Sequence, residues 1–152
     1  MPEKKYLAWM VFFQTSGNDW PDDDGLIDRL LTPPFEPEEE HRLVFEKTTK
    51  VVTHVFLIDS NHPVNVEAAL TLRDPDQTDL LTQYFRLTLT KEQPRARVTL
   101  NVGNSLPLER AGRYEWLFCE KDATTGLYHA ISTYAFAVEY AIDPNSLPAI
   151  KK

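Results

Sequence analysis

The chain is short of the residues that carry covalent and metal chemistry. Its 152 residues include one cysteine, Cys119, so no disulfide can form within the chain. Structural zinc sites draw on several cysteines or on closely spaced histidines, and the four histidines of this chain show no such spacing. A single cysteine is typical of a reducing compartment, and we therefore expect a cytoplasmic protein.

Long apolar runs and clustered positive charge are also scarce. The apolar run at residues 6–13 is much shorter than the roughly 20 residues of a membrane-spanning helix, and no signal-peptide cleavage site follows it. Lys and Arg number 16 against 23 Asp and Glu, which gives a formal net charge of −7. A negative chain repels phosphate backbones, so we expect neither a membrane span nor a nucleic-acid partner.

The motifs of common enzyme classes are missing as well. The chain has only five glycines, none in a phosphate-binding loop, and no serine in a Gly-x-Ser-x-Gly turn. Cys119 follows the apolar residues 116–118, and an apolar environment raises the pKa of a thiol instead of activating it. We therefore expect a protein that is not an enzyme and needs no cofactor.

The sequence does contain a clear alternation of apolar and polar residues at 64–73. Every even position is apolar, and every odd position is polar except Ala69. A period of two places one face of a strand in the core and the other in water. This pattern is typical of antiparallel sheets with one packed face.

Further strand patterns recur at short intervals, separated by turn-forming Pro, Gly, Asn and Asp residues. They predict an all-β fold, an antiparallel immunoglobulin-like β-sandwich of seven to eight strands. The apolar spacing at residues 26–31 is also compatible with one short helix, which Pro33 and Pro34 would end. We expect one sandwich domain over residues 1–142 and a C-terminal tail over 143–152. The other predicted strands are 6–13, 42–46, 51–58, 83–90, 95–102, 112–119 and 128–140.

Two short segments carry a family resemblance. They are Ala111-Gly112-Arg113-Tyr114-Glu115-Trp116 and Leu72-Arg73-Asp74-Pro75-Asp76. With the aromatic first strand, they make the chain resemble uncharacterised bacterial and phage immunoglobulin-like β-sandwich proteins. The chain is also similar to the sugar-recognising sandwich domains of polysaccharide ABC transporters. The resemblance implies a fold, and it brings no established activity and no site residue to this chain.

Acidic residues cluster in two predicted loops and suggest a calcium-dependent binding module as one alternative. Calcium takes six to eight oxygen ligands, which carboxylates on neighbouring loops can supply. Asp-Pro-Asp is more often a simple turn, because Asp accepts hydrogen bonds from its own backbone and Pro fixes φ. We therefore expect no metal site. The residues of the alternative are Asp19, Asp22, Asp24, Asp74, Asp76 and Asp79.

Residues 14–40 are long for a sandwich connection, and unusually long loops are often functional. They hold more apolar side chains than a solvated loop needs, and their prolines limit the cost of ordering on binding. We predict a non-enzymatic binding or assembly module that engages a protein partner or a second copy of itself. Carbohydrate binding is the alternative if exposed aromatic side chains line a groove. The predicted contact residues are Trp20, Leu26, Ile27, Leu30 and Phe35.

Overall fold

The computed structural model describes residues 5–16, 25–32, 43–58, 61–106, 108 and 110–140. These residues form eight strands. No helix in this part of the chain is long and apolar enough to cross a membrane. The strands are β1 (Tyr6–Thr15), β2 (Arg29–Thr32), β3 (Leu43–Leu57), β4 (Val64–Arg73), β5 (Asp79–Leu89), β6 (Arg95–Leu106), β7 (Gly112–Lys121) and β8 (Tyr128–Tyr140).

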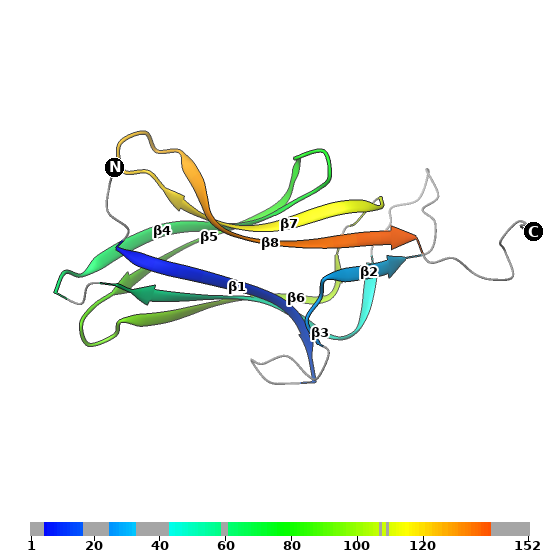
Figure 1. Cartoon of the computed structure of the whole chain (residues 1–152), viewed down its shortest axis with the longest axis horizontal. Coiled ribbons are helices and arrows are strands. Elements are labelled where there is room, and N and C mark those ends of the chain that lie inside the picture. The colour runs from blue at the N-terminus through cyan, green and yellow to red at the C-terminus, as the bar shows by residue number, and fades with distance from the viewer. Residues whose placement is uncertain are drawn as a thin grey trace, which may run out of the picture.

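The strands form two sheets that pack face to face (Figure 1). One sheet has the order β1-β3-β6, and the other has the order β2-β8-β7-β4-β5. The strand pairs are antiparallel apart from β2 and β8, which run parallel. The order β8-β7-β4-β5 matches the G-F-C-C′ order of immunoglobulin variable-type sheets, and β1-β3-β6 matches strands A, B and E. The predicted immunoglobulin-like β-sandwich is confirmed.

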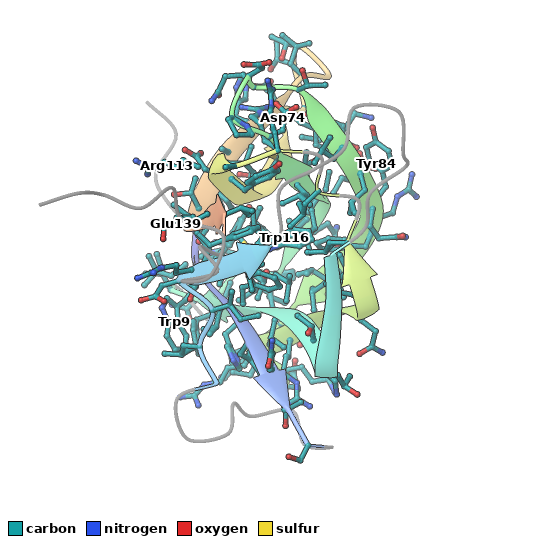
Figure 2. All side chains as sticks on the ribbon, turned by 90° about the vertical axis from the view of Figure 1, so that its right-hand side faces the viewer. Trp9, Asp74, Tyr84, Arg113, Trp116 and Glu139 are labelled. Atoms are coloured by element: carbon teal, nitrogen blue, oxygen red, sulfur yellow. The ribbon has the colours of Figure 1, made fainter. Side chains whose placement is uncertain are left out.

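The core lies between the two sheets and follows the predicted alternation. In β4 the even-numbered residues from Val66 to Leu72 are buried against the opposite sheet. Trp116 of β7 is fully buried and lies at the centre of the molecule in Figure 2. The Phe12 ring of β1 contacts the Trp116 ring edge-on, with 5.4 Å between their centroids. Burial of such large aromatic groups supplies much of the stability of a small domain.

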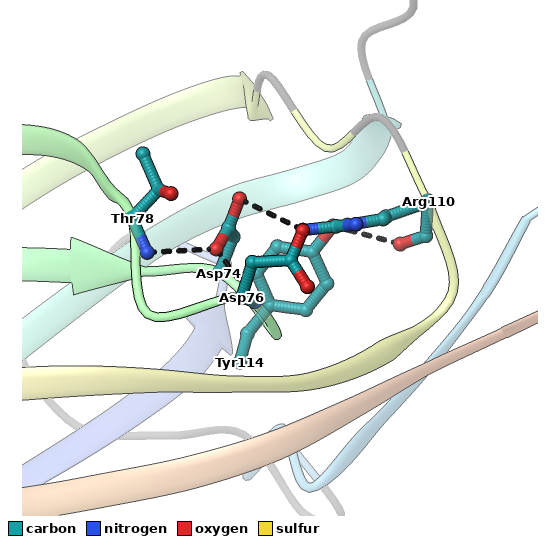
Figure 3. Close-up of polar contacts among 5 residues, drawn as sticks. All are labelled: Asp74, Asp76, Thr78, Arg110 and Tyr114. Atoms are coloured by element: carbon teal, nitrogen blue, oxygen red, sulfur yellow. Dashed lines mark hydrogen bonds and ion pairs between the residues drawn. The ribbon is translucent and has the colours of Figure 1, made fainter.

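The start of β7 carries the tyrosine corner that is typical of immunoglobulin-like domains (Figure 3). The Tyr114 hydroxyl donates a hydrogen bond of 2.7 Å to the backbone carbonyl of Arg110, four residues earlier. In antibody domains a disulfide-forming cysteine stands two residues after this tyrosine. Here that position is Trp116, so an aromatic side chain fills the place that a disulfide occupies in antibodies.

The short helix considered at residues 26–31 is wrong. Leu26 forms an isolated bridge with Phe13, and Arg29–Thr32 is strand β2, in parallel register with β8. The backbone N–H of Ile27 donates to the Phe12 carbonyl at 2.9 Å, and that of Ala137 donates to the Asp28 carbonyl at 2.9 Å. Both sheets thus supply backbone partners for this segment, and such tertiary pairing overrides a weak local preference for helix.

The other differences concern strand boundaries. The segments 42–46 and 51–58 belong to one strand, β3, whose pairing with β6 shifts register between Val44 and Lys50. Such irregularities insert unpaired residues and interrupt the alternation, which is why the sequence pattern divides there. Strand β5 begins at Asp79, before the predicted start at residue 83. The tail at 143–152 lies outside the described residues.

Candidate functional site

The predicted contact residues divide into three groups. The Leu26 side chain is 55% exposed and is available to a partner. Ile27 and Leu30 are 4% and 8% exposed and pack in the main core, so they support β2 and present no side chain to a partner. Trp20 and Phe35 lie outside the described residues. The observed part of the segment therefore serves the sandwich more than a contact surface.

Asp74 and Asp76 belong to the tight turn between β4 and β5 (Figure 3). The Asp74 carboxylate accepts hydrogen bonds from the backbone N–H groups of Asp76 at 2.8 Å and Thr78 at 2.9 Å. The Arg110 guanidinium forms ion pairs with both Asp74 and Asp76. Partial burial acts to raise the pKa of Asp74, but the two N–H groups and Arg110 outweigh it and lower that pKa. These carboxylates hold the turn and are already neutralised.

Asp79 is also engaged, because the Arg73 guanidinium donates to its carboxylate at 3.1 Å. A cation would have to displace these arginines to gain the carboxylate oxygens that calcium needs. Within the described ranges, no three acidic, histidine or cysteine side chains converge into a metal-binding group. The other residues of the calcium alternative, Asp19, Asp22 and Asp24, lie outside the described residues.

Cys119 is buried, although it lies on the outer face of its sheet and not in the sandwich core. It packs with Ala69 and Leu117 in a small separate cluster. Burial raises the pKa of its thiol, with the Arg73 guanidinium acting in the opposite direction and Asp79 adding to the rise. A buried thiol with a raised pKa is a poor nucleophile.

The outer face of the three-stranded sheet carries a partly exposed aromatic surface that the sequence did not indicate. Strand register places two rows of three side chains across β1, β3 and β6. Each row has an apolar or aromatic residue on β1, an aromatic ring on β3 and an arginine on β6. We call this surface the aromatic face. Its rows are Leu7, Phe56 and Arg95, then Trp9, His54 and Arg97.

The rings of the aromatic face form a continuous stack. Trp9 and His54 are stacked with 5.6 Å between ring centroids and 26° between planes. His54 and Phe56 follow at 6.3 Å and 17°. The Arg95 guanidinium lies 5.6 Å from the Phe56 ring centroid, within the range of a cation–π contact. The stack therefore presents a pre-ordered surface.

The aromatic face combines exposed apolar side chains with cationic ones. Trp9 is 59% exposed and Leu7 is 51% exposed. Burial and then the neighbouring Arg97 lower the pKa of His54, so the ring is neutral at pH 7. Arg95 and Arg97 place two cationic side chains on this face, on a chain whose net charge is −7.

The opposite side of the molecule carries a second feature, a shallow pocket on the outer face of the five-stranded sheet. Its volume is about 290 Å³. Figure 2 shows Tyr84 of this pocket and Trp9 of the aromatic face on opposite sides of the buried Trp116. The rings of Tyr84 and Tyr128 lie 5.5 Å apart at 58°. We call this the tyrosine pocket, and its lining residues are Glu67, Tyr84, Phe85, Arg86, Lys121 and Tyr128.

Comparison with known proteins assigns no family to this chain. No family model matches the chain. No curated protein sequence matches it either. Among solved structures it is similar to the soluble domain of PmoD from Methylocystis sp. ATCC 49242 (Rockwell), with 12% identity and a TM-score of 0.38, over 91% of this chain and 94% of that chain. A likeness at this level carries no argument about function.

Proposed function

We propose that the protein is a non-enzymatic binding module that engages a protein partner through the aromatic face. The observation that supports this is the stack of Trp9, His54 and Phe56 on the three-stranded sheet, in which Trp9 is exposed and the other two rings are half-buried. Single exposed apolar residues are common on protein surfaces, whereas contiguous apolar patches mark interaction sites. Trp and Arg are also the residue types most enriched among energetically dominant interface positions.

The charge of the aromatic face indicates the chemistry of the partner. Arg95 and Arg97 lie along β6, at one side of the stack. Opposite charges across an interface favour association and orient the partner. We propose a partner segment that places apolar side chains on Trp9 and a carboxylate beside Arg95. The expected cytoplasmic location belongs to this proposal, since one buried cysteine is compatible with a reducing compartment.

Selection of peptides from a random displayed library on the immobilised protein tests the proposal. We expect the selected peptides to combine acidic and apolar residues. Trp9→Ala should weaken their binding about 30-fold, because loss of a central tryptophan costs about 2 kcal/mol or more. Arg95→Glu should also weaken the binding of these peptides, and selection on this variant should yield peptides with fewer acidic residues. The melting temperature of both variants should stay close to that of the native protein, since these side chains are exposed.

Leu127→Ala is the matched control, because Leu127 is an equally exposed apolar residue, 62% exposed, in the β7–β8 connection. It should leave peptide binding unchanged. Equal loss of binding in Leu127→Ala and Trp9→Ala would contradict the proposal. Failure to select any acidic peptide would also contradict it. Sedimentation analysis distinguishes binding to another protein from self-association. If the partner is a second copy of the chain, Trp9→Ala should abolish the dimer.

A further inference from the structure

The tyrosine pocket combines aromatic rings and charges on four strands of the five-stranded sheet. Tyr84 and Arg86 come from β5, Glu67 from β4, Lys121 from β7 and Tyr128 from β8. Register aligns Glu67 with Arg86. It also pairs Lys121 with Tyr128. The site is therefore built on paired strands, which hold side chains more precisely than loops do.

The charges of the pocket favour an anionic ligand over a cationic one. The Glu67 carboxylate lies 3.3 Å from the Arg86 guanidinium and 3.3 Å from the Lys121 ammonium. One carboxylate is thus shared by two cations, which leaves an excess of one positive charge. A ligand cation would be repelled by Arg86 and Lys121. A ligand carboxylate can pair with one of these two side chains while Glu67 keeps its ion pair with the other.

The shape and polarity of the pocket favour a hydroxylated ring. Two tyrosine rings set at an angle offer apolar faces, and their hydroxyl groups and the three charged side chains offer hydrogen-bond partners. The volume of about 290 Å³ lies near the lower end of the roughly 300–1,000 Å³ range of small-molecule sites. Small-molecule sites are usually lined mostly by apolar groups, and this shallow, mainly polar site suits a ligand that keeps part of its hydration.

We propose that the tyrosine pocket binds a uronic acid, a pyranose sugar that carries a carboxylate. The sugar ring lies against Tyr84 and Tyr128, and its carboxylate pairs with Arg86 and Lys121. This site is independent of the aromatic face, which lies on the other sheet. Failure of one proposal therefore leaves the other standing.

Saturation-transfer NMR and calorimetry with methyl glucuronide and methyl galacturonide test the proposal. The neutral controls are methyl glucoside and methyl galactoside, which keep the ring and lack the carboxylate. We expect a uronide to bind at least about tenfold more tightly than its neutral counterpart, because charge-assisted hydrogen bonds are roughly twice as strong as neutral ones. Added salt should reduce this preference.

Three variants make the test specific. Tyr84→Ala should abolish binding of both sugar types, and Arg86→Gln should reduce the preference for the uronide while retaining neutral-sugar binding. Trp9→Ala, on the opposite face, should bind like the native protein. Tyr84 is 62% exposed, so its removal leaves the fold intact, which a thermal melt verifies. Equal binding of acidic and neutral sugars would overturn the proposal. So would tighter binding of benzoate, an aromatic carboxylate without the sugar ring, than of either uronide. No binding at about 50 mM ligand, far above the roughly 1 mM dissociation constant that corresponds to about −4 kcal/mol, would overturn it as well.

Discussion

At the scale of single residues, Tyr114 and Arg110 connect parts of the chain that are distant in sequence. The Arg110 carbonyl accepts the hydrogen bond of the Tyr114 hydroxyl, while its guanidinium pairs with Asp74 and Asp76 in another turn. Arg110 therefore connects the segment that leads into β7 with the β4–β5 turn. The Tyr114 side chain is 1% exposed, so its hydroxyl has little access to water as a replacement partner.

We predict that Tyr114→Phe lowers the free energy of unfolding by about 1–3 kcal/mol. The substitution keeps the ring in the core but removes the donor, and an acceptor left without its partner in a part-buried site costs up to about that much. Urea denaturation measures the change. Tyr128→Phe is the control, because the Tyr128 ring is 39% exposed, and its change should be below about 0.5 kcal/mol. Similar losses in both variants would contradict a specific role for this hydrogen bond.

At the scale of elements, the first residue of β7 packs against the β4–β5 turn. Gly112 has a φ of +143°, and a Cβ atom at this position would lie 2.5 Å from Pro75 Cγ and 2.9 Å from Pro75 Cβ. The turn and the strand therefore approach more closely than any residue with a side chain permits. Gly126, in the β7–β8 connection, also has a positive φ, of +73°, but a Cβ there would meet no heavy atom within 4 Å.

This pair of glycines compares a positive φ beside a neighbouring ring with a positive φ in open space. Gly126→Ala should cost about 1–2 kcal/mol, since a left-handed conformation is unfavourable for alanine. Gly112→Ala should cost at least about 1 kcal/mol more, because its φ is open essentially to glycine alone and the ring of Pro75 must also move. Thermal and urea denaturation of both variants measure the difference. Equal costs would show that the β4–β5 turn yields freely and does not hold β7.

The β4–β5 turn should also make stability depend on pH. The fold lowers the pKa of Asp74 below its ordinary value of 3.8. A carboxyl whose pKa is lower in the folded state stabilises the fold above the unfolded pKa, and this contribution is lost as pH falls through the folded pKa. We predict that Asp74→Asn is less stable than the native protein at neutral pH, and that the difference shrinks as pH falls below about 4.

Urea denaturation over a series of pH values measures this effect. Arg110→Gln keeps the Asp74 carboxylate but removes its cationic partner, so its pH dependence should fall between those of the native protein and Asp74→Asn. If the difference between the native protein and Asp74→Asn is constant from about pH 6 to about pH 2, the charge of Asp74 contributes nothing to the fold.

At the scale of the whole molecule, the aromatic face and the tyrosine pocket belong to different sheets, with the core between them (Figure 2). Substitutions at distant sites with no shared partners are usually additive within about 0.5 kcal/mol. We predict that the double variant Trp9→Ala, Tyr84→Ala changes the free energy of unfolding by the sum of the two single changes. A double-mutant cycle in urea measures the coupling, and a coupling above about 1 kcal/mol would show that the two faces communicate through the core.

The alternation at 64–73 predicted the sandwich because burial on one face of a strand leaves a direct trace in the sequence. The predicted strands from residue 64 onward correspond to β4 to β8, with differences at their ends. The helix predicted as possible at 26–31 was wrong because the apolar spacing of this segment suits a helix as well as a short strand. Pairing with β8 determines that it forms a strand. Such long-range pairing is absent from local periodicity.

The candidate sites were less predictable than the fold. Trp9 lies in a continuous apolar run, which gives no sign of which residues face outward. Its role becomes visible only when register places it beside His54 and Arg97. The tyrosine pocket likewise depends on four strands whose order in the sheet the sequence does not state. Sites of this kind arise from strand pairing, and the local sequence pattern does not contain them.

The parallel pairing of β2 with β8 has a consequence for the order of folding. Arg29 lies opposite Ala137, so an early strand finds its neighbour only in the last strand of the sandwich. On a ribosome, β1 and β3 can pair while synthesis continues, but the edge that β2 completes must wait until β8 has emerged. Pairing over such sequence separation is entropically costly and slows folding. Docking of β2 is therefore a late event, and a nascent chain that stops before β8 leaves the backbone of Arg29–Thr32 without its partner strand.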